Sequence, residues 1–101
     1  MSLSLADRDL TDLSDPIIEK ELLLIKKQPS DILHLDLSNN SLKFGEELKP
    51  FNNLKTLIID NNFFYSLEEF PKMTGLETFS ANKNQFSNLN IFLEVYIFNL
   101  F

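Results

Sequence analysis

The segment "ILHLDLSNNSL", from Ile32 to Leu42, alternates apolar and polar residues and then reaches two consecutive asparagines. Alternation with a period of two is typical of a strand with one buried face, because successive side chains point to opposite sides. Two similar segments follow, "LKTLIIDNNFF" from Leu54 and "LETFSANKNQF" from Leu76, so that the copies start 22 residues apart. The sequence therefore predicts a repeat in which each copy begins with a short strand.

The three copies share an apolar pattern that extends well past the strand. Each fits L-x-x-L-x-L-x-x-N-x-L, with Ile, Phe or Ala at some apolar positions, and the agreement continues to Phe51, Met73 and Val95. Among the recurring apolar positions, only Gly45 and Ala81 carry poor fillers. Agreement at a fixed period indicates a repeat architecture, and the copies divide as 32–53, 54–75 and 76–97.

This pattern resembles the leucine-rich repeat family, in the 22-residue intracellular form typified by a regulatory subunit of protein phosphatase 1. The resemblance covers residues 32–95. It implies a short α/β solenoid, with a curved parallel sheet on the concave side and helical or irregular segments on the convex side. Residues 98–101 then start an incomplete fourth repeat.

One asparagine recurs at the end of each predicted strand and is expected to hold the fold. A sharp turn there leaves backbone donors and acceptors without partners, at a cost of about 1 to 3 kcal/mol each. An asparagine amide both donates and accepts, so one side chain can bridge its own turn and the neighbouring one. We predict a structural ladder of Asn40, Asn62 and Asn84, which leaves the preceding Asn39 free at the rim.

Residues 1–31 are predicted to form a degenerate first repeat that includes an N-terminal helix. Leu3 and Leu5 match strand positions, and Arg8 stands where the asparagine belongs. After a cap at Ser14 or Asp15, "PIIEKELLLIKKQ" is predicted to be helical as far as Pro29. Its apolar face is expected to consist of Ile18, Leu22 and Ile25. The alternative is a free amphipathic helix on a membrane surface, which its mixed polar face disfavours.

The other end of the chain carries no predicted cap. Phe98 and Phe101 fit the first and fourth positions of a further repeat, and the preceding stretch "IFLEVYIFNLF" is strongly apolar. Solenoids expose their last apolar layer unless something covers it. We expect either a shortened product of a longer gene or an end covered by a partner or by self-association with a second copy, and we favour the first.

Composition disfavours several classes of function. Fifteen acidic residues against nine basic ones give a net charge of −6, which repels nucleic acid and anionic lipid. The most apolar stretch is too short to span a membrane, which takes about 20 residues. The start, "MSLSLADRDL", carries acids where a secretory signal needs basic and then apolar residues, so a cytoplasmic or nuclear location is expected.

The sequence offers few groups for catalysis or metal binding. Cysteine is absent, and His34 is the only histidine. Asp36 and Asp60 lie in successive copies near the same edge of the predicted sheet, but two carboxylates are too few for calcium, which takes 6 to 8 oxygens. Neither a nucleophilic serine motif nor a glycine-rich phosphate loop is present. We therefore expect a protein that is not an enzyme and uses no metal or cofactor.

What remains is the surface that the outward residues of the strands would form. Neighbouring repeats align these residues in columns about 4.8 Å apart. Ile58 is the apolar centre of this face, and it is either an interface anchor or a residue that favours strand formation. Aromatic residues outside the core pattern, Phe44, Phe63 and Tyr65, are either interface or packing. The predicted partner-binding residues are His34, Asp36, Ser38, Thr56, Ile58, Asp60, Thr78, Ser80, Asn82 and Lys83.

The function that these features favour is binding of a partner protein through the concave face. The identity of the partner does not follow from the sequence. The resemblance also implies a second hypothesis, a regulatory subunit of an enzyme such as a phosphatase. A third is a role in a ribonucleoprotein particle, which the acidic balance disfavours, and a fourth is a truncated variant without a function of its own.

Overall fold

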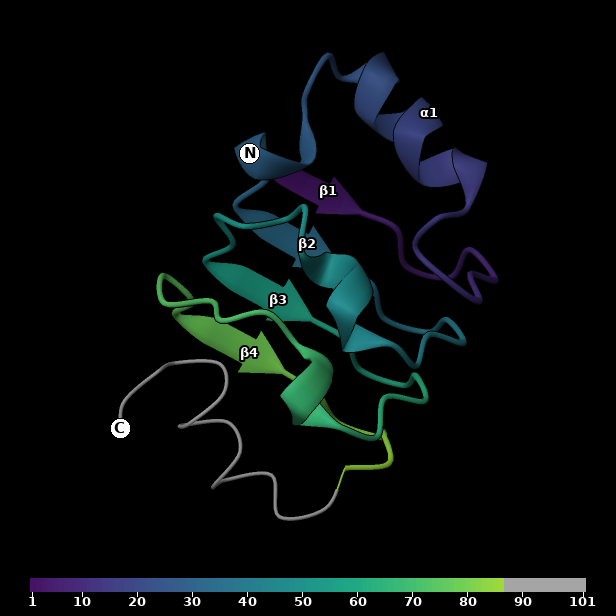
Figure 1. Cartoon of the computed structure of the whole chain (residues 1–101). Helices are drawn as coiled ribbons and strands as arrows, with labels where there is room; N and C mark the ends of the chain where they lie inside the picture. Colours follow the sequence, from purple (N-terminus) through teal and green to yellow (C-terminus); the bar gives the residue numbers. More distant parts are fainter. Residues whose placement is uncertain (87–101) are drawn as a thin grey trace.

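Four short parallel strands lie side by side in the order of the sequence (Figure 1). The computed structural model describes residues 1–86. Within them the strands are β1 (Ser2–Ser4), β2 (His34–Asp36), β3 (Thr56–Ile58) and β4 (Thr78–Ser80). The predicted α/β class and parallel sheet are confirmed. The end of the predicted third copy and the start of the fourth, with Val95, Phe98 and Phe101, lie outside the described residues.

The register of the sheet follows the 22-residue spacing of the sequence. His34 pairs with Thr56 and Thr56 pairs with Thr78, and β1 joins at the other edge through Ser2 opposite His34. Backbone hydrogen bonds extend the ladder past the three-residue strands, since Leu37 N donates to Ile58 O at 2.8 Å and Ile59 N to Ser80 O at 2.8 Å. The strands are therefore short, but the pairing of the chain continues toward the asparagine turns.

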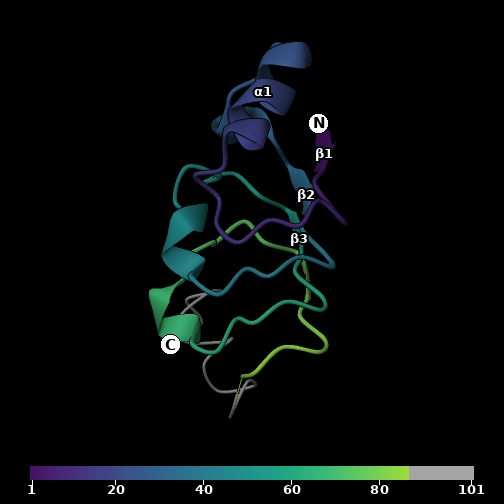
Figure 2. The same cartoon turned by 90° about the vertical axis from the view of Figure 1, so that its right-hand side faces the viewer.

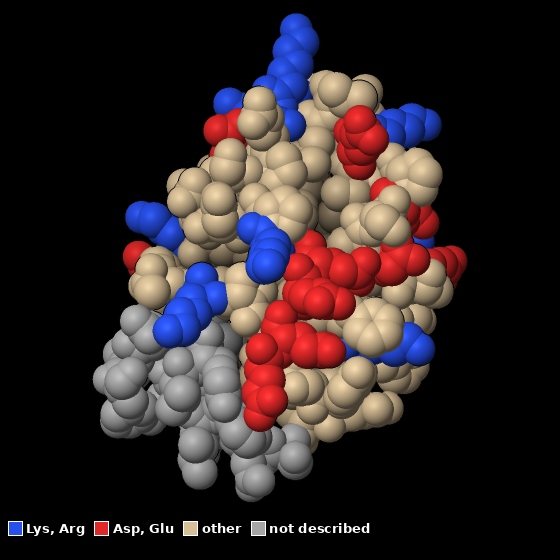
Figure 3. Space-filling view, in the orientation of Figure 1, with Lys and Arg blue, Asp and Glu red and all other residues tan. Residues whose placement is uncertain are grey.

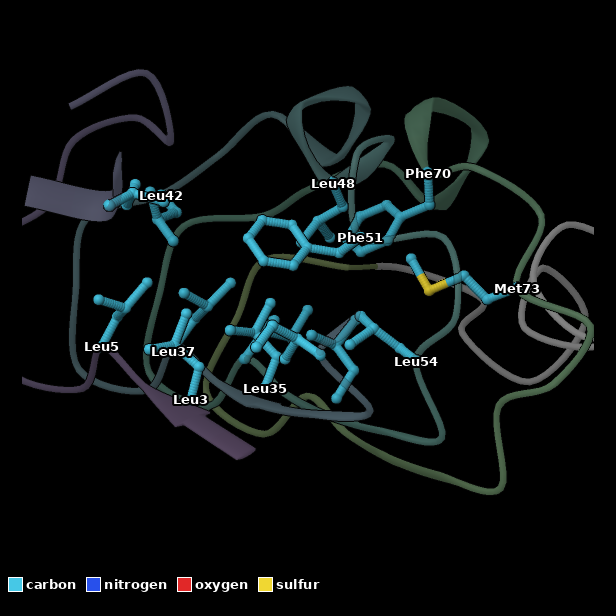
Figure 4. Packing of buried hydrophobic residues seen from close by; sticks show 14 of the residues in the cluster. Leu3, Leu5, Leu35, Leu37, Leu42, Leu48, Phe51, Leu54, Phe70 and Met73 are labelled. Atoms are coloured by element: carbon cyan, nitrogen blue, oxygen red, sulfur yellow. The ribbon is translucent and has the colours of Figure 1, made fainter. Parts of the chain in front are cut away.

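The side of the sheet opposite its outward face is covered by helical segments, and we call it the helical side (Figure 2). It carries α1 (Pro16–Leu24) and the 3₁₀ turns η2 (Gly45–Leu48) and η3 (Leu67–Glu69), while η1 (Pro29–Asp31) precedes β2. Leucines of the strands face Leu48, Phe51 and Phe70 across the interior (Figure 4). Within residues 1–86 the apolar positions of the sequence pattern thus contribute to one continuous core, against which Phe79, Ala81 and Phe86 pack partly buried.

The helix α1 is shorter than predicted. Asp15 caps its N-terminus, where the Asp15 carboxylate accepts a hydrogen bond from Ile17 N at 2.9 Å. The helix ends at Leu24, because Lys26 adopts a left-handed conformation with φ 56° and Lys27 N donates back to Leu22 O at 3.0 Å. This bond pattern is a Schellman C-cap. The predicted extension to Pro29 was wrong.

The predicted apolar face of the helix is correct only in part. Ile18 and Leu22 are buried, whereas Ile25 is 38% exposed. Ile25 follows the last helical residue and directly precedes the left-handed turn at Lys26, so it no longer continues the helical face. The C-terminal end of α1 therefore leaves apolar side chains exposed at the surface.

In the sequence pattern Gly45 is a poor filler of an apolar position, but the structure shows why glycine stands there. A Cβ atom at Gly45 would lie 2.1 Å from Cδ1 of Phe70, far inside van der Waals contact. The Phe70 ring therefore occupies the space that a side chain at position 45 would need. Glycine is the residue that this packing requires.

Candidate functional site

The outward side chains of the four strands form the candidate site, which we call the sheet face. Two columns of in-register neighbours cross the sheet. All of these outward side chains are exposed or half-buried, whereas the central residue of each of the first three strands, which points to the other side, is buried. The structure thus brings together the predicted residues His34, Thr56 and Thr78 in one column and Asp36, Ile58 and Ser80 in the next.

A hollow of about 420 Å³ lies over the first three strands of the sheet face. Ser2, Ser4, His34, Asp36, Thr56 and Ile58 line it. Ile58 pairs with Asp36 on one side and Ser80 on the other, and it is half-buried. The apolar side chain therefore stands among polar ones, which is compatible with both roles predicted for it.

Hydrogen bonds orient the polar side chains of this face. Nδ1 of His34 lies 2.9 Å from Oγ1 of Thr56. Oδ1 of Asp36 accepts hydrogen bonds from the backbone N–H and the hydroxyl of Ser38. These groups are therefore held in place without being fully buried.

Asp60 follows β3 as Ser38 follows β2, and its carboxylate is also hydrogen-bonded. Oδ1 of Asp60 accepts from the Ser80 hydroxyl at 2.7 Å and from Asn82 N at 2.8 Å. The predicted residues Asp60, Ser80 and Asn82 therefore contact each other directly. Lys83 follows at the rim and is exposed.

The three recurrent asparagines make corresponding hydrogen bonds. Each amide oxygen accepts a hydrogen bond from a backbone N–H of the preceding turn. Each amide nitrogen donates to a carbonyl oxygen in the preceding segment and to the one three residues before the asparagine itself. Asn40 and Asn62 are buried, and Asn84 is half-buried. These residues bridge neighbouring turns and are not part of the exposed sheet face.

The residue before each of these asparagines has a structural constraint that the sequence interpretation missed. Asn39, Asn61 and Lys83 have φ values of 60°, 56° and 57°. This left-handed region is unfavourable for most side chains, and asparagine tolerates it well. Asn61 Nδ2 also donates to Asn39 Oδ1 at 2.8 Å. Asn39 is therefore exposed, as predicted, but its identity is explained by the turn.

Arg8, in place of the first asparagine, acts differently from the ladder residues. Its backbone N–H donates to Oδ1 of Asn40 at 3.1 Å, while its guanidinium reaches Glu21 of α1 at 3.2 Å. Position 8 belongs to the first turn, whose strand β1 lies at the edge of the sheet. The side chain ties the turn to the helix instead.

The extra aromatic residues lie outside the buried core. Phe44 is 38% exposed, and Phe63 and Tyr65 are each 48% exposed. Phe63 and Tyr65 line a shallow hollow together with Lys43, whose Nζ lies 5.8 Å from the Phe44 ring centre. An interface role for these residues stays a prediction.

Metal sites and membrane spans are not found in the part of the chain that the structure describes. No group of three or more histidine, cysteine or acidic residues within 1–86 is arranged to hold a metal ion. None of the helices in this range has the length and apolar character needed to cross a membrane.

Comparisons with known proteins add no assignment. No family model matches the chain, and neither the search of curated proteins nor that of solved structures returns a match.

Proposed function

We propose that this chain is a leucine-rich repeat solenoid of the 22-residue type and that it binds a partner protein through the sheet face, the concave side of that solenoid. The solenoid is supported by the spacing of the strands and by the matching hydrogen bonds of Asn40, Asn62 and Asn84. The buried apolar residues of successive segments form one cluster, as expected when repeats stack on their neighbours.

The observation that carries the binding proposal is the in-register arrangement of outward side chains around a hollow with Ile58 in it. Binding to a protein suits this face because it is broad, shallow and mixed in polarity. An apolar residue surrounded by polar ones is the usual composition of an interface core and rim. Hydrogen bonds already orient His34, Asp36 and Asp60, which leaves less entropy to be lost on binding.

The experiment uses site-specific photocrosslinking in cells. One variant carries the crosslinking residue at Thr78 on the sheet face, and the matched control carries it at Lys49 on the helical side; both positions are exposed. The proposal expects a defined partner to be crosslinked from Thr78 and not from Lys49.

Two further variants test whether the face itself makes the contact. Ile58→Arg places a charge in the hollow and is expected to abolish the crosslink from Thr78, whereas Glu68→Arg on η3 leaves it intact. Urea unfolding of both variants checks that they remain folded. The same crosslinked product from Lys49, or an undiminished product with Ile58→Arg, contradicts the proposal.

A further inference from the structure

A second hollow lies on the helical side, between α1 and the segment around η2, and we call it the helix groove. It encloses about 360 Å³. It exists because the connection after β1 is a full helix while the next one is a short 3₁₀ turn, so the two do not pack along their whole length. It shares no lining residue with the hollow over the sheet face, so the two are distinct.

The floor of the groove is apolar and its rim carries an exposed leucine. Ile18, Leu22 and Phe51 belong to the buried core and also line the groove, and Leu13 packs against them. Leu23 lines the same groove with 70% of its side chain exposed. An exposed large apolar side chain beside an apolar concavity is a common feature of binding sites.

The charges around the groove are mainly negative. Asp15, Glu19 and Glu47 line it, against one basic residue, Lys27. Acidic side chains also gather over the neighbouring η2 and η3, where each first turn carries two glutamates (Figure 3). The groove therefore combines an apolar floor with an acidic margin.

Within this margin, the Glu47 carboxyl has one buried oxygen atom whose hydrogen-bonding capacity is not satisfied within residues 1–86. Its Oε2 accepts from Leu13 N at 3.1 Å, while its Oε1 is buried without a hydrogen-bond partner among the described residues. Burial raises the pKa of the Glu47 carboxyl, and the nearby Asp12 and Glu46 charges act in the same direction. A cation brought to this margin would offset all three effects.

We propose that the helix groove binds a segment of a partner protein that presents apolar side chains flanked by lysine or arginine. The apolar side chains pack on Leu22, Leu23 and Phe51, and a basic side chain lies against Glu47 or Glu19. Charge complementarity selects this occupant, because an acidic segment of the same shape would be repelled. The proposal concerns a different surface from the sheet face and does not depend on the proposed function.

The test uses a short synthetic peptide with leucines at helical spacing and lysines on both flanks, and a second peptide with glutamate at the lysine positions. Binding of each to the full chain is measured by fluorescence anisotropy at low salt. The lysine peptide is expected to bind saturably and the glutamate peptide is not. Failure of the lysine peptide to bind, or equal binding of both peptides, overturns the proposal.

Adjacent residues of α1 provide the decisive matched pair. Leu23 lines the groove and Leu24 does not, yet the two are 70% and 69% exposed, so neither substitution disturbs the core. Leu23→Lys is expected to weaken binding about tenfold and Leu24→Lys by less than about twofold. Both changes add the same charge, so equal weakening would indicate general electrostatic attraction and contradict a site.

Two charge variants and a sheet-face variant complete the design. Glu47→Gln is expected to weaken binding about fivefold, while Glu68→Gln, which removes the same charge outside the groove lining, has a smaller effect. Ile58→Arg is expected to leave peptide binding unchanged, which separates this surface from the proposed function. Loss of peptide binding in Ile58→Arg, or equal effects of the two glutamate variants, counts against the helix groove.

Discussion

The turns that follow the strands and the connections on the helical side differ in how closely they repeat from one segment to the next. The amide nitrogens of Asn40, Asn62 and Asn84 each lie 2.9 Å from a carbonyl oxygen of the preceding segment. On the helical side, by contrast, a helix of nine residues is followed by 3₁₀ turns of four and three residues.

The difference follows from the interactions that hold each side. Hydrogen bonds depend on distance and direction, so a buried donor and acceptor fix the turn geometry closely. Apolar packing requires mainly a suitable volume, and several backbone conformations can provide it. The three turns that contain Asn40, Asn62 and Asn84 are therefore alike, whereas the helical side varies and leaves a groove where two unlike connections meet.

Loss of a turn asparagine should have the largest effect on stability. Asn62→Ala leaves Leu42 N without its acceptor and the carbonyls of Leu37 and Ile59 without this donor, inside a site where Asn62 is only 3% exposed. At about 1 to 3 kcal/mol for each unsatisfied group, we expect a loss of about 3 kcal/mol in the free energy of unfolding. Urea unfolding followed by circular dichroism measures it.

Asn84→Ala is the matched comparison for that variant. Asn84 makes the corresponding bonds to Phe64 N and Ile59 O, but it is half-buried, so water can replace part of what the side chain provides. We expect a loss of about 1 kcal/mol. Equal losses for the two variants would show that burial does not determine the strength of these turns.

On the helical side, a small change of side chain should be costly only where an aromatic ring already fills the space beside it. Gly45→Ala places a methyl group against Phe70, and overpacking of this kind costs about 2 kcal/mol. The backbone of Gly45 does not have a positive φ, so a conformational penalty is not expected to contribute. Thermal and urea unfolding measure the loss.

A double mutant separates the clash from other effects at Gly45. Phe70→Leu removes the ring atoms that an alanine at position 45 would meet, although it also loses the contact with the Phe64 ring, whose centre lies 5.3 Å away. We expect Gly45→Ala combined with Phe70→Leu to lose less stability than the two single changes added together. Strict additivity would contradict a direct clash.

Sequence reasoning succeeded for the features that the spacing of residues determines directly. The period of 22 residues predicted the parallel sheet and its sequential order, because alternation and spacing reflect the register directly. It failed at the end of α1, since the left-handed turn at Lys26 carries no glycine or asparagine to mark it. It also could not predict the role of Gly45, because the ring that fills its space comes from a residue 25 positions later.

The candidate sites show the same limit. The alignment of outward residues on the sheet face follows from the repeat and was predictable, including the neighbours Asp36, Ile58 and Ser80. The contacts of Asp60 with Ser80 and Asn82 required side-chain geometry. The helix groove depends on how α1 and η2 sit against each other, which no local pattern encodes.

A smaller effect is expected at Lys83, which occupies a left-handed position directly before Asn84. Lys83 adopts φ 57°, where Asn39 and Asn61 occupy the corresponding positions. Left-handed backbone costs an ordinary residue about 1 to 2 kcal/mol, and it costs asparagine less. Lys83→Asn should therefore stabilise the protein by about 0.5 kcal/mol, measured by urea unfolding, with Lys49→Asn as the exposed control outside such a turn. A loss of stability would contradict left-handed strain at this position.

The smallest effect is expected at Glu47 on the helical side, and it depends on pH. Burial raises the pKa of the folded-state carboxyl above its ordinary value, so the charged form is disfavoured by folding. At neutral pH, Glu47→Gln should be more stable than the native chain by no more than about 0.5 kcal/mol, with the bond to Leu13 N retained. As pH falls from the raised folded-state value toward the unfolded value of about 4.3, the native carboxyl takes up its proton first and the difference closes. Urea unfolding of both proteins across this range measures it, and a difference that widens toward acid would mean that Glu47 is stabilised in its charged form.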